Sequence, residues 1–214
     1  MANFPIKGVI WYQGESNADH VEIYKHAFPL LVKSWRKVWG PELPFYYVQL
    51  SSINRPSWPY FRNAQRELES LVPNTGMAVT SDLGDSLDVH PRKKKEVGER
   101  LALLALANTY QQPITSRGPA IQKATRKRDQ IVLDFSQAQE LQSQGNATLS
   151  GFELEDKKGN PIKVKATIVQ NQVHLTIPKN VQPVKVLYGW QPFTRANLIN
   201  EAQLPASTFS IDIN

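Results

Sequence analysis

Apolar segments of two different periods alternate along the first half of the chain, and this alternation restricts its fold more than any other feature. Continuous apolar runs predict buried strands, whereas apolar residues at three- and four-residue spacing predict amphipathic helices. The expected strands are 7–12, 45–50 and 76–81, and the expected helices are 22–39, 60–71 and 93–108. Pro29 is expected to bend or divide the first helix. Such a series is typical of a parallel sheet covered by helices.

The pattern changes after Pro113. Short runs rich in β-branched and aromatic residues are separated there by Gly, Asn, Pro or Asp, which favours antiparallel strands joined by turns. The expected strands are 131–135, 152–154, 164–169, 173–177 and 184–188. We therefore predict an α/β domain over residues 1–112 and a small antiparallel β domain over 113–214.

Composition excludes several kinds of site. The sequence has no cysteine, which rules out disulfides and thiolate metal sites, and its four histidines are scattered, so we expect no metal and no cofactor. The net charge of +6 is spread along the chain except at 92–95 and 126–128, so we expect no nucleic-acid partner. No apolar run reaches the roughly 18 residues of a membrane span, and we expect no membrane partner.

Polar segments follow the first and third expected strands. Residues 11–18 read WYQGESNA and residues 82–91 read DLGDSLDVHP. Together with residues 55–66, the helix after His90 and residues 188–198 (YGWQPFTRANL), they resemble the sialate O-acetylesterase family of SGNH-type hydrolases. The resemblance covers nearly the whole chain. It implies a three-layer α/β/α parallel sheet, incomplete at its amino end, followed by the antiparallel β domain.

In that family, as the resemblance implies, a serine attacks an acetyl ester, a histidine takes its proton and an acidic residue orients the histidine. His90 matches the histidine segment. Serine is a weak nucleophile at neutral pH, so an imidazole must lie within hydrogen-bond reach and a carboxylate must fix its tautomer. The usual spacing is Asp-x-x-His, but Leu87 occupies that position, so we expect Asp88 to be the acid, with Asp85 as the alternative.

The remaining site residues also follow from the resemblance. Gln13 and Asn17 match the segment that supplies a side-chain amide to the oxyanion hole, a donor worth about 3 kcal/mol. Glu15 is expected to accept hydrogen bonds from neighbouring loops and, with Arg55, to line the substrate site. Three aromatic residues are candidates for stacking on a sugar or for ordinary packing, namely Trp58, Tyr60 and Trp190.

The nucleophile is the open question. The resemblance places it in a Gly-Gln-Ser-Asn motif well before Gln13, and that motif does not occur in the sequence, so we expect a fragment that is inactive alone. Alternatively, residues 14–18 (GESNA) resemble the elbow Gly-x-Ser-x-Gly, which would make Ser16 the nucleophile of an α/β-hydrolase-like esterase. That fold usually takes its acid and histidine from separate loops, whereas here they share one.

A rival class is a noncatalytic carbohydrate-binding or structural module in which Trp190 and its neighbours bind glycan. The expected partner in the enzymatic interpretation is an acetylated sugar or glycan, sialic acid above all. An incomplete sheet would leave an unpaired edge, which predicts self-association. The resemblance to this family also implies that the full-length protein is secreted or periplasmic.

Overall fold

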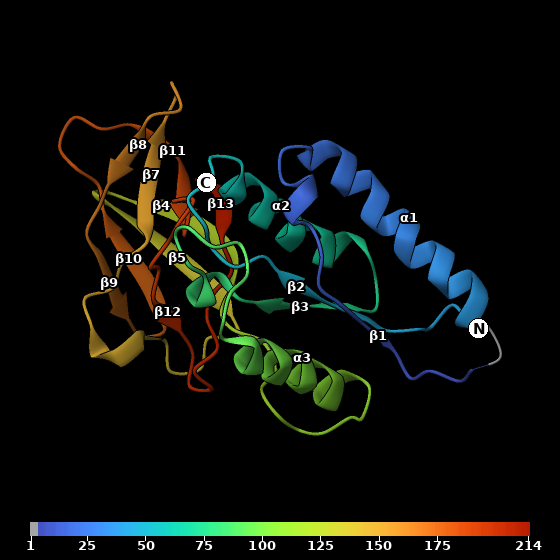
Figure 1. Ribbon diagram of the computed structural model, residues 1–214. Helices are drawn as coiled ribbons and strands as arrows, with labels where there is room; N and C mark the ends of the chain where they lie inside the picture. The colour runs from blue at the N-terminus through green and yellow to red at the C-terminus, as the bar shows by residue number, and fades with distance from the viewer. Residues whose placement is uncertain (1–3) are drawn as a thin grey trace.

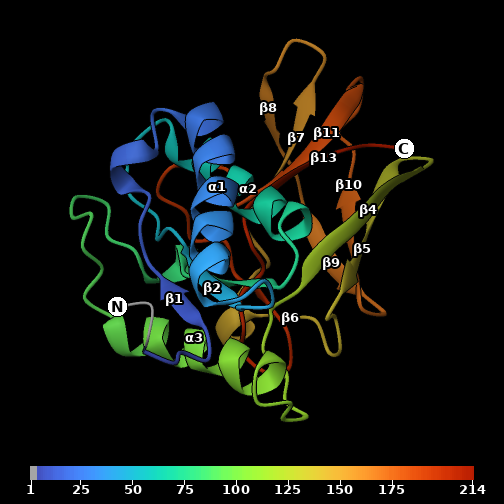
Figure 2. The same ribbon diagram turned by 90° about the vertical axis from the view of Figure 1, so that its right-hand side faces the viewer.

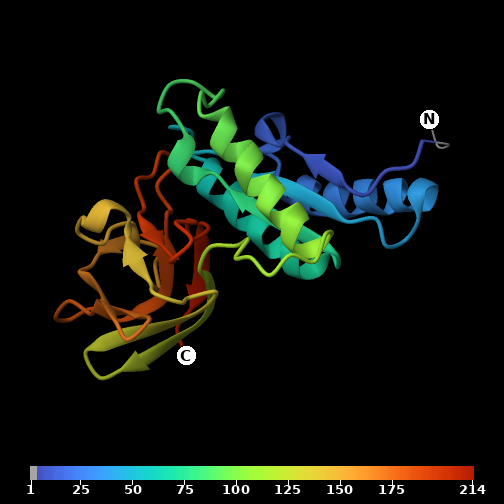
Figure 3. The same ribbon diagram turned by 90° about the horizontal axis from the view of Figure 1, so that it is seen from below.

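The computed structural model describes residues 4–214, which form a helix-covered parallel sheet beside a group of antiparallel strands (Figure 1). Figure 3 shows the two parts next to each other, with the helices on one side and the antiparallel strands on the other. Within residues 4–214, every helix is too short or too polar to span a lipid bilayer.

Three parallel strands form the first sheet in the order β1-β2-β3, with β2 in the centre. Their bounds are Val9–Trp11 for β1, Phe45–Gln49 for β2 and Thr75–Val79 for β3. Three long helices follow the strands in turn, α1 at Val21–Trp39, α2 at Trp58–Leu71 and α3 at Lys94–Asn108. Short 3₁₀ helices follow β1 and β3, namely η1 at Glu15–Asn17 and η2 at Ser81–Leu83.

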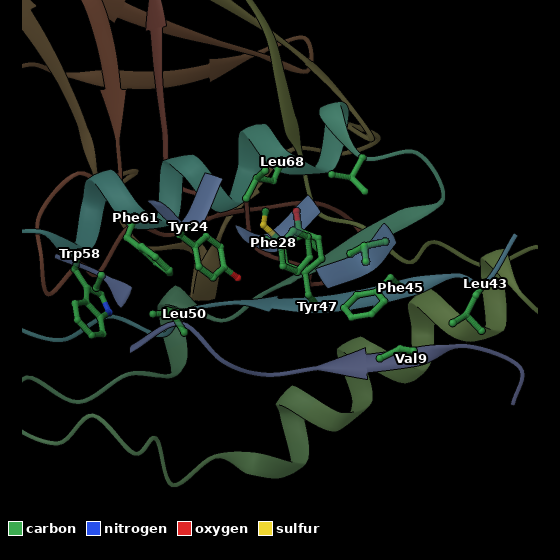
Figure 4. Close-up of a cluster of buried hydrophobic side chains, with 14 of the residues drawn as sticks. Val9, Tyr24, Phe28, Leu43, Phe45, Tyr47, Leu50, Trp58, Phe61 and Leu68 are labelled. Carbon is green, nitrogen blue, oxygen red and sulfur yellow. The ribbon is translucent and has the colours of Figure 1, made fainter. Parts of the chain in front are cut away.

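Successive side chains of β2 point to opposite faces of the sheet, and each face is covered by helices. Phe45 and Tyr47 belong to the cluster that α1 and α2 cover, where the ring of Phe28 lies 4.8 Å from that of Tyr47 (Figure 4). Tyr46 packs on the other face against Leu104 of α3. Figure 1 shows α1 and α2 on one side of the sheet and α3 on the other. The whole of β2 is therefore buried, as its continuous apolar run predicts.

Antiparallel strands make up the rest of the chain, with a core cluster of their own (Figure 2). The first four-stranded sheet has the order β4-β5-β10-β9, formed by Ala120–Lys127, Gln130–Ser136, Gln172–Thr176 and Ala166–Val169. The second has the order β13-β11-β7-β8, formed by Phe209–Asp212, Pro183–Tyr188, Phe152–Asp156 and Pro161–Lys163. A third pair joins β12 (Leu198–Ile199) to β6 (Gln142–Ser143), which the 3₁₀ helix η3 (Gln144–Asn146) follows.

The predicted alternation of strands and helices and the predicted antiparallel region are both confirmed. Helix α1 runs through Pro29 without a break, so the proline does not divide it. The sequence prediction missed β4, because most of its polar side chains are exposed. It also missed four strands of only two to four residues, namely β6, β8, β12 and β13. The boundary between residues 112 and 113 stays a prediction.

Candidate active site

The loops that follow the three parallel strands lie at one end of the sheet, because parallel strands have their carboxyl ends at the same edge. These loops are residues 12–20, 50–57 and 80–93. Figures 2 and 3 show the green loop after β3 and the blue turn after β1 at the same end of the molecule. The predicted polar segments therefore do meet.

His90 and Asp88 contact each other in the loop after β3. The imidazole Nδ1 of His90 lies 3.3 Å from Oδ1 of Asp88, and the side chain of His90 is 84% exposed. The backbone N–H of His90 also donates to Asp88 at 2.9 Å, and this bond holds the pKa of the Asp88 carboxyl below its ordinary value. Asp85 instead accepts from the backbone N–H of Leu87 at 2.8 Å. Asp88 is thus placed to orient the imidazole, while Asp85 shapes the turn.

The turn after β1 joins the two amide side chains that the sequence singled out. Nε2 of Gln13 donates to Oδ1 of Asn17 at 2.6 Å, which leaves the amide N–H groups of Asn17 without an acceptor among residues 4–214. Asn17 is therefore the better donor to an incoming oxygen. The expected hydrogen bonds to the Glu15 carboxylate are not found among the described residues.

Two tyrosines underlie this turn, Tyr24, which is buried, and Tyr12, which is partly buried. Burial, with a smaller contribution from the Glu15 carboxylate, raises the pKa of Tyr24 to about 12. Burial likewise raises the pKa of Tyr12, with a smaller contribution from Glu15. Both hydroxyls stay neutral at physiological pH. The negative charge of Glu15 thus raises the pKa of both phenols.

The two loops are linked through residues next to the candidate catalytic side chains. The ammonium group of Lys94, four residues after His90, lies 4.9 Å from the centre of the Tyr12 ring. Val89 packs against the same apolar cluster as Tyr12. The Asp88–His90 pair is therefore anchored beside the turn that carries Gln13 and Asn17. No hydrogen bond joins the two groups directly among the described residues.

The loop after β3 also passes very close to the loop after β2, at Gly84. A Cβ atom added to Gly84 would lie 2.0 Å from the carbonyl oxygen of Ser52, which is a backbone atom and cannot rotate away. The loop carrying His90 therefore depends on glycine at this position for space, since the φ of Gly84 is −75° and suits any residue.

Replacing Gly84 by alanine is expected to lower the free energy of unfolding by about 2–3 kcal/mol, as overpacking against a fixed neighbour does. The matched control is Gly98→Ala in α3, where an added Cβ would meet nothing within 4 Å. That change is expected to stabilise the protein by about 0.5–1 kcal/mol, because alanine favours helix. Urea unfolding of both variants provides the measurement, and equal midpoints would contradict the assignment.

The geometry of Ser16 does not match that of a nucleophile elbow. Ser16 lies inside the 3₁₀ helix η1 and is exposed. The residue with the unusual backbone is Gly14, with φ of 149°, and a Cβ there would lie 2.6 Å from the Phe61 ring. An elbow serine is held in a strained turn that aims its hydroxyl at the histidine. Among residues 4–214, no hydrogen bond links Ser16 to His90.

Two of the other expected residues lie at the start of α2. Arg55 is exposed, and its guanidinium lies 5.3 Å from the centre of the Trp58 ring. Trp58 is buried and donates its indole N–H to the carbonyl of Ser51 at 2.7 Å, so of the two alternatives it takes the packing role. Tyr60 and Trp190 remain accessible and form a pair with centroids 5.2 Å apart.

Sequence reasoning missed two arginines that tie segments of the structure together. Arg62 is fully buried and donates to the carbonyls of Gly189 and Gln191, each at 2.7 Å, and of Pro192 at 2.9 Å. Arg100 forms a two-pronged ion pair with Asp82 at 2.6 and 2.7 Å, at the end of β3. The sequence does indicate that Arg62 is buried, because it occupies a position on the apolar stripe of its helix.

The acidic and histidine side chains of the described residues do not form a metal site. Within residues 4–214, no three His, Asp or Glu side chains come close enough together to bind one. The chemistry available here is that of an imidazole, a carboxylate and amide donors, a set that serves proton transfer and stabilisation of a developing oxyanion.

Comparisons with known proteins identify the family of the chain. Residues 1–107 match the family described as carbohydrate esterase, sialic acid-specific acetylesterase. Sialate O-acetylesterases of Mus musculus and Homo sapiens are each 34% identical over 168 residues, covering 67% of this chain and 31% and 32% of theirs. A crystal structure of a carbohydrate acetylesterase from Xanthomonas citri matches 99% of this chain with a TM-score of 0.91 and 34% identity. This chain spans about a third of the curated relatives and 51% of that solved chain.

Proposed function

This chain belongs to the carbohydrate esterase family of sialic acid-specific acetylesterases, and on that premise we propose that it takes part in hydrolysing acetyl esters on sugars, sialic acid above all. The observation that carries the proposal is the Asp88–His90 pair, anchored beside the turn of Gln13 and Asn17 at the carboxyl end of a parallel sheet. We also propose that this sheet belongs to an SGNH-type three-layer α/β/α fold.

Each residue has a role in the proposed reaction. His90 accepts the proton of a serine hydroxyl as that oxygen attacks the acetyl carbon, and then returns it to the leaving sugar oxygen. Asp88 holds the tautomer and stabilises the imidazolium. The Asn17 amide, oriented by Gln13, donates to the oxyanion of the tetrahedral intermediate. Glu15 and Arg55 lie on adjoining loops of this end of the sheet and line the substrate site.

The attacking serine is proposed to come from outside these residues. The family's Gly-Gln-Ser-Asn motif does not occur in the sequence, and Ser16 lacks the geometry of a nucleophile. The high exposure of His90 is compatible with a hydroxyl supplied from another segment.

An activity assay tests this assignment. The 214-residue chain alone is expected to hydrolyse 4-nitrophenyl acetate and O-acetylated sialic acid no faster than buffer. Joined in one chain to the Xanthomonas citri residues that lie outside the match, it is expected to release acetate from both. Turnover by the 214 residues alone that disappears in Ser16→Ala would contradict the assignment and favour the elbow.

Self-association is a further proposal, because β1 lies at the edge of its sheet and carries exposed apolar groups. Ile10 in β1 is 68% exposed, and Phe4, which precedes the strand, is 72% exposed. Sedimentation is expected to show dimers that Ile10→Lys dissociates. Ile23→Lys on helix α1, at a position that is 62% exposed, is the control and should leave the dimers intact. A compact wild-type monomer would end this proposal.

We retain the secreted or periplasmic location as a proposal drawn from the family. Fractionation of cells that express the natural gene tests it, and recovery of the protein in the cytosol alone would overturn it.

A further inference from the structure

A polar groove of about 430 Å³ runs between helix α2 and the second antiparallel sheet. Tyr60, Asn63 and Glu67 contribute from α2, and strands β7, β11 and β13 form the opposite wall. The backbone N–H of Ser210 on β13 donates to Asn63 at 3.2 Å, so the helix and the sheet are joined along the floor. The groove is separate from the loop that carries His90.

One end of the groove has an aromatic wall. The rings of Tyr60 and Trp190 meet edge to face, with centroids 5.2 Å apart and planes at 75°. Neither the Tyr60 hydroxyl nor the Trp190 indole N–H has a hydrogen-bond partner among residues 4–214, so both polar tips are available to a ligand.

The backbone beside Trp190 is held in place, since Arg62 donates to the carbonyls of Gly189 and Gln191 on either side of it. The wall is therefore fixed in position before any ligand arrives. A pre-organised aromatic face of this kind suits the C–H face of a pyranose ring, because the ring face is negative and the C–H groups are slightly positive.

The other lining groups are charged and suit hydroxyl groups. Lys185 lies between Glu155 and Asp212 in cross-strand register, and its ammonium is 4.0 Å from the Glu155 carboxylate. Glu67 adds a third carboxylate, which Lys25 approaches to 3.2 Å. Carboxylates accept hydrogen bonds from sugar hydroxyls. Three carboxylates and one ammonium group line the groove itself, while Lys25 and Arg66 contact Glu67 from outside the lining, and this local excess of negative charge repels a ligand that carries its own carboxylate.

We propose that this groove is a binding site for an uncharged pyranose unit, a hexose or N-acetylhexosamine. The Tyr60 ring stacks on the pyranose, Trp190 borders it with its plane at 75° to that of Tyr60, and Glu67, Glu155 and Asp212 accept from the sugar hydroxyls. The site goes beyond the proposed ester hydrolysis and does not depend on it. It selects against sialic acid, so it recognises a neutral part of a glycan.

Titration of the 214-residue chain with N-acetyllactosamine, followed by ¹H–¹⁵N NMR, tests the proposal. Binding is expected, and 3′-sialyllactose is expected to bind at least about threefold more weakly because of its carboxylate. Tyr60→Ala should weaken N-acetyllactosamine binding at least about fivefold through loss of the stacking face, while Tyr60→Phe retains it.

The matched control is Tyr110→Ala, because Tyr110 is 58% exposed and Tyr60 57%, so the two variants lose the same side chain at equal exposure. Tyr110→Ala should bind as wild type does. The proposal is overturned if N-acetyllactosamine shows no binding at about 10 mM, the weak end for a ligand of this size, if Tyr60→Ala binds it like Tyr110→Ala, or if 3′-sialyllactose binds more tightly. Because the readout is binding, none of these outcomes bears on whether acetyl esters are cleaved.

Discussion

Replacing His90 by alanine is expected to reduce kcat for acetate release by at least about 10³-fold in the joined enzyme that contains these residues and the family's serine. Loss of the imidazole leaves the serine hydroxyl without a base, and the amide donors of the oxyanion hole supply only the residual rate. Initial rates with 4-nitrophenyl acetate under saturating conditions provide the measurement.

The control is His26→Ala, which removes an imidazole from the exposed face of α1. It is expected to leave the rate unchanged. A His90→Ala enzyme that retains more than about a tenth of the activity would remove His90 from the proposed mechanism, since a general base contributes at least about 10²-fold.

The same assay separates the two acids. Asp88→Asn should lower kcat about 10²-fold or more, because Asp88 is the one acid among the described residues that contacts the imidazole, at 3.3 Å. Asp85→Asn should have a much smaller effect, since Asp85 accepts from backbone N–H groups of the turn. The reverse order would restore Asp85 as the orienting acid.

Replacing Arg62 by alanine is expected to lower the free energy of unfolding by about 3–5 kcal/mol. The guanidinium is fully buried, and its removal leaves the carbonyls of Gly189, Gln191 and Pro192 without their donor. These carbonyls belong to the segment after β11, so the change also loosens the packing of α2 against the antiparallel part. Urea unfolding monitored by tryptophan fluorescence measures the effect.

Arg66→Ala is the matched control on the same helix. Arg66 is partly exposed and contacts Asn63 and Glu67 of its own helix, so its loss should cost less than about 1 kcal/mol. Equal losses in the two variants would contradict the role assigned to Arg62.

The Arg62 effect should also be independent of pH near neutrality. Burial lowers the pKa of Arg62 to about 9. A basic group whose pKa is lowered by folding binds fewer protons in the folded than in the unfolded chain only above that lowered pKa. The contribution of Arg62 to the free energy of unfolding therefore depends on pH only in alkaline solution. The difference between wild type and Arg62→Ala is therefore expected to be the same at about pH 6 and pH 8.

The sequence by itself determined the order and type of the main elements. Runs such as FYYVQL at 45–50 can only be buried on both faces, and the helical stripes between them supply the cover. The strand β4 was not predicted because Ala124 is its only buried residue, so its place in the sheet is set by pairing with β5 rather than by its own pattern.

The candidate site divides in the same way. The sequence singled out His90, Asp88, Gln13 and Asn17 as candidates, because each lies in a segment that resembles the family, and their catalytic roles stay predictions. Only the tertiary structure placed Asp88 against the imidazole, matched Gln13 with Asn17 and brought Lys94 over Tyr12. It also decided that Trp58 is buried and Tyr60 exposed, two residues apart on one helix.

The physical reason is the range of the interactions. Hydrophobic periodicity and turn chemistry act over a few residues, so they can be recognised in the sequence alone. The Arg62 bonds to residues 189–192 and the contact of Gly84 with Ser52 join segments that are distant along the chain. Such contacts depend on how whole helices, strands and loops pack against one another, and local sequence patterns do not contain that information.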